Sequence, residues 1–182
     1  MRRLGIVALP AGLIAVVALD LLDRLAASPA WLAAAGLPAG LIILLVTTLV
    51  TSRRGLRFAL RQLLATVASP FRSPPTAARA LVVVAAATGE EMLFRLLGLW
   101  LLGTGPLGIG VTSAAFAVAH LPAARPERRA VTLLDAGLCG VLLAITFEAT
   151  GGIAAAAVAH AVRNLALDSL RRAREDHERK DR

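Results

Sequence analysis

The sequence predicts an all-α protein, a polytopic bundle of about six helices that cross a membrane. Hydrophobic residues make up 57% of the 182 positions, and the mean hydropathy is +0.71. Several apolar runs are about twenty residues long, which is the length that an α-helix needs to cross the hydrocarbon core. These runs are apolar on every face, unlike the amphipathic helices of a soluble protein, and they lack the ten-residue alternation of a membrane β-barrel.

The spans are predicted from apolar length and from the Gly, Pro and charged residues that separate the runs. The first run resembles a signal peptide with "AAS" as a cleavage site, but it is long and more runs follow, so we expect an uncleaved helix. We expect one transmembrane domain over residues 1–170, with a motif-bearing core over 79–170 and a charged cytoplasmic tail over 171–182. The predicted spans are Leu4 to Leu22, Ala30 to Thr51, Arg79 to Leu102, Pro106 to Leu121, Ala130 to Glu148 and Ile153 to Leu170.

Basic residues are concentrated in the loops on one side of this predicted bundle. Such an excess marks the cytoplasmic side, and it explains the net charge of +8 better than a nucleic-acid partner, which we do not expect. We therefore expect a multi-pass protein of the inner, or plasma, membrane with both termini in the cytoplasm. Only Arg24 lies in an opposite loop, whereas the cytoplasmic set comprises Arg2, Arg3, Arg53, Arg54, Arg57, Arg61, Arg72, Arg79, Arg125, Arg128, Arg129 and the tail.

Basic and apolar residues alternate at helical spacing between the second and third predicted spans. Arg53, Arg57 and Arg61 recur every four residues beside Leu56 and Leu60. This pattern predicts a helix that lies on the cytoplasmic membrane surface. The alternative is a solvated, charged linker.

Several ionisable residues lie inside the predicted spans, where each costs about 2.5 to 3.5 kcal/mol and is therefore a candidate for a functional site. Glu91 and Arg95 are four residues apart with the acid first, so they are predicted to pair on one helix face. Glu90 is turned about 100° away from Glu91. It has no basic residue three or four positions further along, so it needs a partner from another helix.

Glu90, His120 and His160 are predicted to lie at a similar depth on three different helices. Glu90 and His160 are each eleven residues from the basic cytoplasmic end of their span, which is about 16 Å. Counted from the outer side, Glu90 and His120 are about 20 and 21 Å deep. Counted from Arg125, His120 is only about 7 Å deep, so this placement requires the fourth span to be short.

A carboxylate, two imidazoles and a carboxamide, screened from bulk solvent, have the groups needed to activate water. His160 and Asn164 share one helix face, and the small residues before His160 let this helix approach a neighbour closely. In one hypothesis Glu90 is the general base, and His and Asn stabilise the oxyanion. In the other, a divalent metal such as zinc is held by His120, His160 and Glu90, although the HExxH signature is missing.

Three short motifs occur in order on three predicted spans: EExxxR at Glu90, Glu91 and Arg95, FxxxH at Phe116 and His120, and HxxxN at His160 and Asn164. Together they resemble the CAAX-protease and bacteriocin-processing (CPBP or ABI) family of intramembrane endopeptidases. The resemblance covers Arg79 to about Leu170. It implies hydrolysis of peptide bonds in membrane-associated proteins or hydrophobic peptides, with the lipid bilayer as the surrounding partner.

The resemblance also implies roles for these seven residues. Glu90 would activate the water, and His120, His160 and Asn164 would complete the catalytic set. Glu91, Arg95 and Phe116 would take pairing and positioning roles. Such enzymes are described either as metal-dependent or as metal-free glutamic proteases. We favour the metal-free description, with no cofactor, because His160 with Asn164 on one helix is a poorer set of metal ligands than two histidines with an acid.

Two functions of other classes remain as alternatives. A catalytically inactive membrane scaffold or immunity factor would keep the fold and lose the activity. A proton-coupled transporter would also bury Glu and His, but we find no internal repeat of the kind that such transporters carry.

Overall fold

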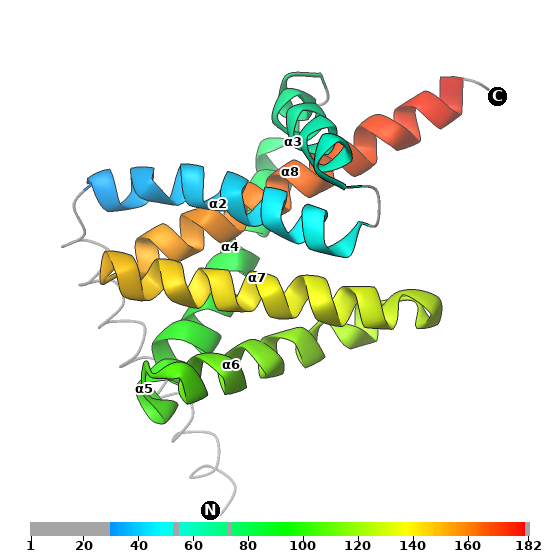
Figure 1. Ribbon diagram of the computed structural model, residues 1–182. Helices are drawn as coiled ribbons and strands as arrows, with labels where there is room; N and C mark the ends of the chain where they lie inside the picture. The colour runs from blue at the N-terminus through cyan, green and yellow to red at the C-terminus, as the bar shows by residue number, and fades with distance from the viewer. Residues whose placement is uncertain (1–29, 53–54, 73, 181–182) are drawn as a thin grey trace, which may run out of the picture.

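The computed structural model describes residues 30–52, 55–72 and 74–180 (Figure 1). Every regular element within these ranges is helical, which confirms the predicted all-α class for the described part of the chain. The first predicted span, Leu4 to Leu22, lies outside these residues.

Four of the helices coincide with predicted spans. α2 (Ala30–Thr51) matches the second span residue for residue. α6 (Pro106–Ala119) begins with a proline, a residue that is common at the first helical position because its fixed φ suits a helix start. α7 (Arg129–Thr150) is capped by Gly151, which adopts a left-handed φ of +67° that residues with a Cβ atom rarely adopt. α8 (Ile153–Lys180) is the longest helix among the described residues.

The third predicted span consists of three helical segments in direct succession. α4 (Ala77–Glu91) is capped by the Thr76 side chain, and it passes into a π-helix, η1 (Met92–Leu97). α5 (Gly98–Leu102) then completes the span. The sequence predicts helix over this range but does not indicate the π-helix.

Three further elements connect the spans. α3 (Gly55–Arg72) occupies the position of the predicted surface helix, between α2 and α4. Two 3₁₀ turns, η2 (Leu121–Ala123) and η3 (Pro126–Arg128), join α6 to α7. The fourth span therefore ends close to His120, as its predicted depth requires.

Three segments within the described ranges are long and apolar enough to cross a membrane: Ala34–Thr51, Pro106–Ala123 and Pro126–Thr150. The other two predicted spans in these ranges carry the polar motif residues on α4 and α8, which lower their hydropathy. Large apolar side chains such as Trp100 and Leu107 are about four-fifths exposed on the outside of the bundle (77% and 80%). Exposed apolar surface of this kind is typical of helices that face lipid, and the protein is a helical membrane protein.

α2 and α8 form the most extensive helix–helix contact in the described bundle. A Cβ atom at Gly36 would lie 2.6 Å from the carbonyl oxygen of Ala155, and one at Gly40 would lie 2.6 Å from that of Ala159. Two glycines at this GxxxG spacing let the helix backbones touch. The close approach predicted for the small residues of α8 is thus confirmed, with α2 as the neighbour.

An ion pair with two hydrogen bonds joins the first turn of α4 to α8. Nε and one terminal nitrogen of Arg79 donate to the two carboxylate oxygens of Asp168, at 2.8 and 2.6 Å. Arg172 lies 3.3 Å from the same carboxylate. These contacts set how α4 and α8 face each other.

α8 continues beyond the predicted end of its span at Leu170 and projects from the bundle as far as Lys180 (Figure 1). Arg171 lies 3.5 Å from Asp168 and 3.6 Å from Glu175. Ion pairs three and four residues apart stabilise a helix, which explains why the start of the charged tail is helical here.

Candidate active site

The two adjacent glutamates stand at the junction between α4 and the π-helix η1. Glu91 is fully buried, whereas 36% of the Glu90 side chain is exposed. Because consecutive helical residues point about 100° apart, the two carboxylates face different neighbours. Short π-helical segments within α-helices are rare and occur frequently at functional sites.

His120 ends α6, one turn after Phe116. Its Nδ1 lies 2.8 Å from the carbonyl oxygen of Phe116. Since a carbonyl oxygen only accepts, Nδ1 carries the proton and donates it to this bond. The other ring nitrogen, Nε2, lies 3.7 Å from Glu90 Oε2.

His160 is buried on α8 and is held in the same way by a different acceptor. Its Nδ1 donates to Glu91 Oε1 at 2.9 Å. Its Nε2 lies 3.7 Å from Glu90 Oε2. Both imidazoles therefore direct Nε2 toward one oxygen of Glu90.

This convergence is the central feature of the candidate active site. Glu90 comes from α4, His120 from the end of α6 and His160 from α8, so three helices contribute to it. Glu90 Oε2 is buried and makes no hydrogen bond among the described residues. A separation of 3.7 Å is longer than a direct hydrogen bond, and polar groups at such distances are commonly bridged by water.

Phe116 packs against both imidazoles from one side. Its ring centroid lies 4.4 Å from that of His120 and 5.6 Å from that of His160. Phe94 of the π-helix meets Phe116 edge-on at 5.2 Å, and it packs against the buried apolar cluster of Phe116, Ala117 and Ala136. Phe116 thus contributes a carbonyl to orient one histidine and a ring to support both.

Arg95 is buried among these groups without a conventional set of partners. Its Nε lies 3.4 Å from Glu91 Oε2, as the spacing of four residues predicts, but the guanidinium makes no hydrogen bond among the described residues. Its central carbon lies 5.1 Å from the centre of the Phe116 ring. A guanidinium near an aromatic ring is stabilised by a cation–π interaction, which partly replaces water here.

Asn164 lies on α8 one turn after His160 and is half-buried. Its carboxamide makes no hydrogen bond to Glu90 or to either histidine in the described structure. Among the seven residues of the three motifs, the structure therefore brings six into one connected cluster and leaves Asn164 beside it.

Sequence reasoning anticipated the Glu91–Arg95 pair but not the second partner of Glu91. The bond to His160 joins residues 69 positions apart, and no local pattern indicates it. The bond between His120 and the Phe116 carbonyl could have been found, because residues four apart in a helix are neighbours.

Residues 72–166, slightly more than half of the chain, match the family of type II CAAX prenyl endopeptidases described as Rce1-like. The matched range includes all three polar motifs. The chain belongs to the Rce1-like family. This family is part of the predicted CPBP group, and its description implies that the protein is a protease. No curated protein and no solved structure gave a match to the chain.

Proposed function

We propose that this Rce1-like protein is an intramembrane endopeptidase in which Glu90 activates water to hydrolyse peptide bonds of membrane-anchored or hydrophobic substrates. The observation that supports this function is the convergence of His120 Nε2 and His160 Nε2 on Glu90 Oε2, at 3.7 Å each. Family membership supports peptide-bond cleavage as the reaction.

In the proposed reaction Glu90 removes a proton from water as the water oxygen attacks the peptide carbonyl carbon. The tetrahedral intermediate then collapses, and the same proton passes to the departing amine. Because each Nδ1 is already bonded to an acceptor, Nε2 of a neutral ring accepts a hydrogen bond from water. Once protonated, Nε2 donates to the oxyanion, whereas Asn164 donates in either case.

The proposed mechanism uses no metal ion. If the enzyme were metal-dependent, Glu90, His120 and His160 would be the ligands, but no group of three or more His, Cys, Asp or Glu side chains in the described structure is arranged to hold a metal ion. We expect the purified protein to cleave a fluorogenic peptide at an unchanged rate after dialysis against a chelator. A loss of activity that zinc restores would establish the metal mechanism instead.

Replacing Glu90 with Gln is the direct test of the proposed base. General-base catalysis contributes about 10²- to 10⁴-fold, so we expect Glu90→Gln to lose turnover by that factor. Its abundance in the membrane should not change, because Glu90 Oε2 makes no hydrogen bond in the described structure. Glu127→Gln is the control, since Glu127 is exposed on η3 and lies outside the cluster.

The measurement is peptide cleavage by equal amounts of purified native and variant protein. Proteomic comparison of membrane peptides from cells with each protein would then identify the substrate. If Glu90→Gln cleaves at the native rate, the glutamate mechanism is wrong, and a scaffold of the same fold becomes the better description.

The proposal includes a multi-pass location in the inner (plasma) membrane with about six spans and both termini in the cytoplasm. The arginine-rich loops on one predicted side support this orientation. α3 is proposed to lie at the cytoplasmic surface of the membrane. Leu56, Leu60 and Leu64 support this position, because all three are exposed on the outer side of the helix beside Arg57 and Arg61.

A further inference from the structure

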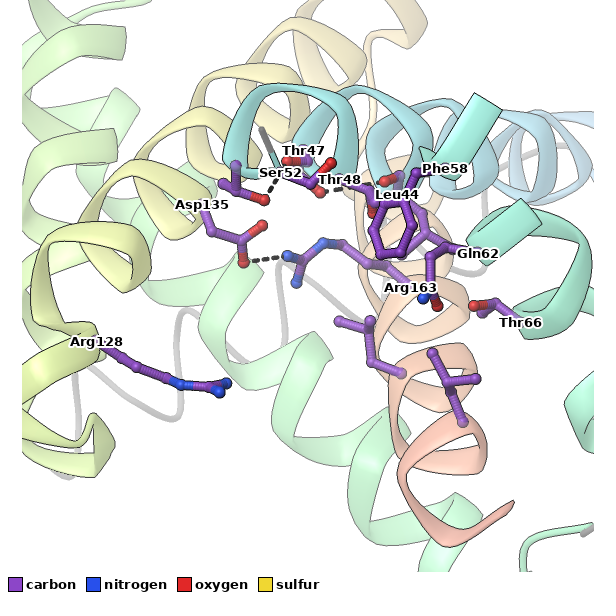
Figure 2. A pocket seen from close by; sticks show the side chains of 13 residues that line it. Leu44, Thr47, Thr48, Ser52, Phe58, Gln62, Thr66, Arg128, Asp135 and Arg163 are labelled. Atoms are coloured by element: carbon purple, nitrogen blue, oxygen red, sulfur yellow. Dashed lines mark hydrogen bonds and ion pairs between the residues drawn. The ribbon is translucent and has the colours of Figure 1, made fainter. Parts of the chain in front are cut away.

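A cavity of about 390 Å³ lies between α2, α3, α7 and α8, and the proposed catalytic residues do not line it (Figure 2). Polar side chains line it together with Leu44, Phe58, Leu167 and Leu170. The end of α2 and the residue after it contribute Thr47, Thr48, Thr51 and Ser52, of which Thr47 and Thr51 donate their hydroxyl protons to carbonyl oxygens of α2. Polar groups that line a cavity between apolar helices indicate that the cavity has a function.

Three charged side chains also line this cavity: Arg128 from η3, Asp135 from α7 and Arg163 from α8. Arg163 is 7% exposed, and one of its terminal nitrogens donates to Asp135. Figure 2 shows the Arg163 guanidinium directed toward Asp135, with the Arg128 side chain apart from this pair. Two guanidinium groups and one carboxylate leave a net positive charge in the cavity.

The Arg163 guanidinium has donors beyond those used by Asp135. Its Nε is buried and makes no hydrogen bond in the described structure. An unsatisfied buried donor costs free energy, and a guanidinium presents five N–H groups in a planar arrangement that suits phosphate. The Ser52 hydroxyl is likewise buried without a hydrogen-bond partner there.

One end of the cavity lies where two apolar segments end. The apolar segment of α2 ends at Thr51, and the apolar segment that includes α7 begins at Pro126. Thr48, Ser52 and Arg128 line the cavity at these same two ends. The end of the cavity beside Arg128 would therefore lie near the lipid headgroups, and Asp135 and Arg163 line it farther along α7 and α8.

The orientation of α3 beside the cavity also favours a lipid. Phe58, Gln62 and Thr66 of α3 line the cavity, whereas Leu56, Leu60 and Leu64 are 55%, 41% and 68% exposed on the outside. A helix on the surface of a soluble protein has the opposite arrangement, with apolar residues inward. The exposed leucines are suited to acyl chains next to the cavity.

We propose that this cavity binds the phosphate-bearing headgroup of an anionic membrane lipid, for which phosphatidylglycerol has suitable chemistry. Arg128 and Arg163 bind the phosphate through charge-assisted hydrogen bonds. The headgroup hydroxyls donate to the Asp135 carboxylate and bond to the hydroxyls of α2. This lipid site is separate from the catalytic cluster and does not depend on the proposed proteolytic function.

The test uses the full chain purified in a mild detergent and incubated with phosphatidylglycerol, phosphatidylcholine or inorganic phosphate. Native mass spectrometry measures the bound lipid. We expect phosphatidylglycerol to bind tightest. Arg128→Gln should weaken its binding about tenfold, as expected for the loss of one charge-assisted hydrogen bond. Arg129→Gln is the matched control, because Arg129 is also exposed but does not line the cavity, and it should bind like the native protein.

Arg163 is tested together with its partner, because removing one charge alone would leave the other buried. The double variant Arg163→Gln with Asp135→Asn should fold, as judged by an unchanged melting temperature, and should lose the preference for phosphatidylglycerol.

Four results would overturn the proposal. They are equal binding of phosphatidylglycerol and phosphatidylcholine, equal losses for Arg128→Gln and Arg129→Gln, native binding by both Arg128→Gln and the double variant, and displacement of phosphatidylglycerol by inorganic phosphate. The last result would mean that the cavity binds soluble phosphate rather than a lipid.

Discussion

Glu91 divides its carboxylate between two buried partners. Oε1 accepts a hydrogen bond from His160 at 2.9 Å, and Oε2 lies 3.4 Å from Arg95. Removing one member of a buried ion pair typically costs about 3 to 5 kcal/mol, because the other charge is left unpaired. At the scale of single residues, Glu91 therefore has two separable effects: it orients His160 and it neutralises Arg95.

Replacing Glu91 with Met should remove both effects. We expect a loss of stability of about 3 to 5 kcal/mol, because Arg95 stays buried without its anion. Turnover should fall by at least about tenfold, because His160 loses the acceptor that orients Nε2. Thermal unfolding in detergent measures the first change, and peptide cleavage measures the second.

Two further variants separate these effects. The double variant Glu91→Met with Arg95→Met should recover stability and remain poorly active. Glu91→Gln keeps an acceptor for His160 but loses the charge beside Arg95. It should therefore be less stable than the native protein and more active than Glu91→Met. If the double variant regains both stability and activity, Glu91 has no positioning role.

At the scale of helices, the close contact of α2 with α8 determines where His160 lies. Gly36 and Gly40 bring the α2 backbone against Ala155 and Ala159, and Ala159 directly precedes His160. On its other side α8 is held to α4 by the pair of Arg79 and Asp168. A shift of α8 would therefore move His160 relative to Glu90.

Adding a methyl group at Gly36 should disturb this contact. A Cβ there would lie 2.6 Å from both the Ala155 carbonyl oxygen and Val158 Cβ, so the helices must separate. We expect Gly36→Ala to destabilise the protein by about 1 to 3 kcal/mol, as overpacking generally does, and to lower turnover as well. Gly110→Ala on α6 is the control, because no neighbouring atom lies within 4 Å of the place that a Cβ would take there, and alanine favours helix. Equal melting temperatures for the two variants would contradict the proposed close packing.

At the scale of the whole molecule, labelling of single cysteines tests the predicted orientation of the bundle in the membrane. Cys139 is the single cysteine of the chain and is buried, so it can be replaced to provide a background for labelling. We expect Thr104→Cys, between α5 and α6, to react with a membrane-impermeant maleimide in spheroplasts. Arg125→Cys, between α6 and α7, should react only after lysis, because the loops rich in arginine are predicted to be cytoplasmic. The reverse pattern of labelling would place the termini outside.

The sequence alone predicted much of the candidate site because of the membrane. A polar residue in an apolar span is costly, so Glu90, Glu91, Arg95, His120 and His160 are conspicuous among the apolar residues that surround them in the sequence. Helix rise then placed Glu90 and His160 at one depth, and the structure brings their side chains to 3.7 Å. The roles of these residues, including the catalytic role of Asn164, remain predictions.

The sequence by itself determined where most of the described helices lie along the chain and predicted the depths of the polar residues, because apolar length and a constant rise per residue are local properties. Only the tertiary structure decided that Glu91 bonds to His160, that Arg79 holds Asp168 and that Arg163 lines a polar cavity with Asp135. Each of these contacts depends on how far one helix is rotated toward another. Hydrophobic periodicity indicates which residues share a face of a helix, but it does not determine which faces meet.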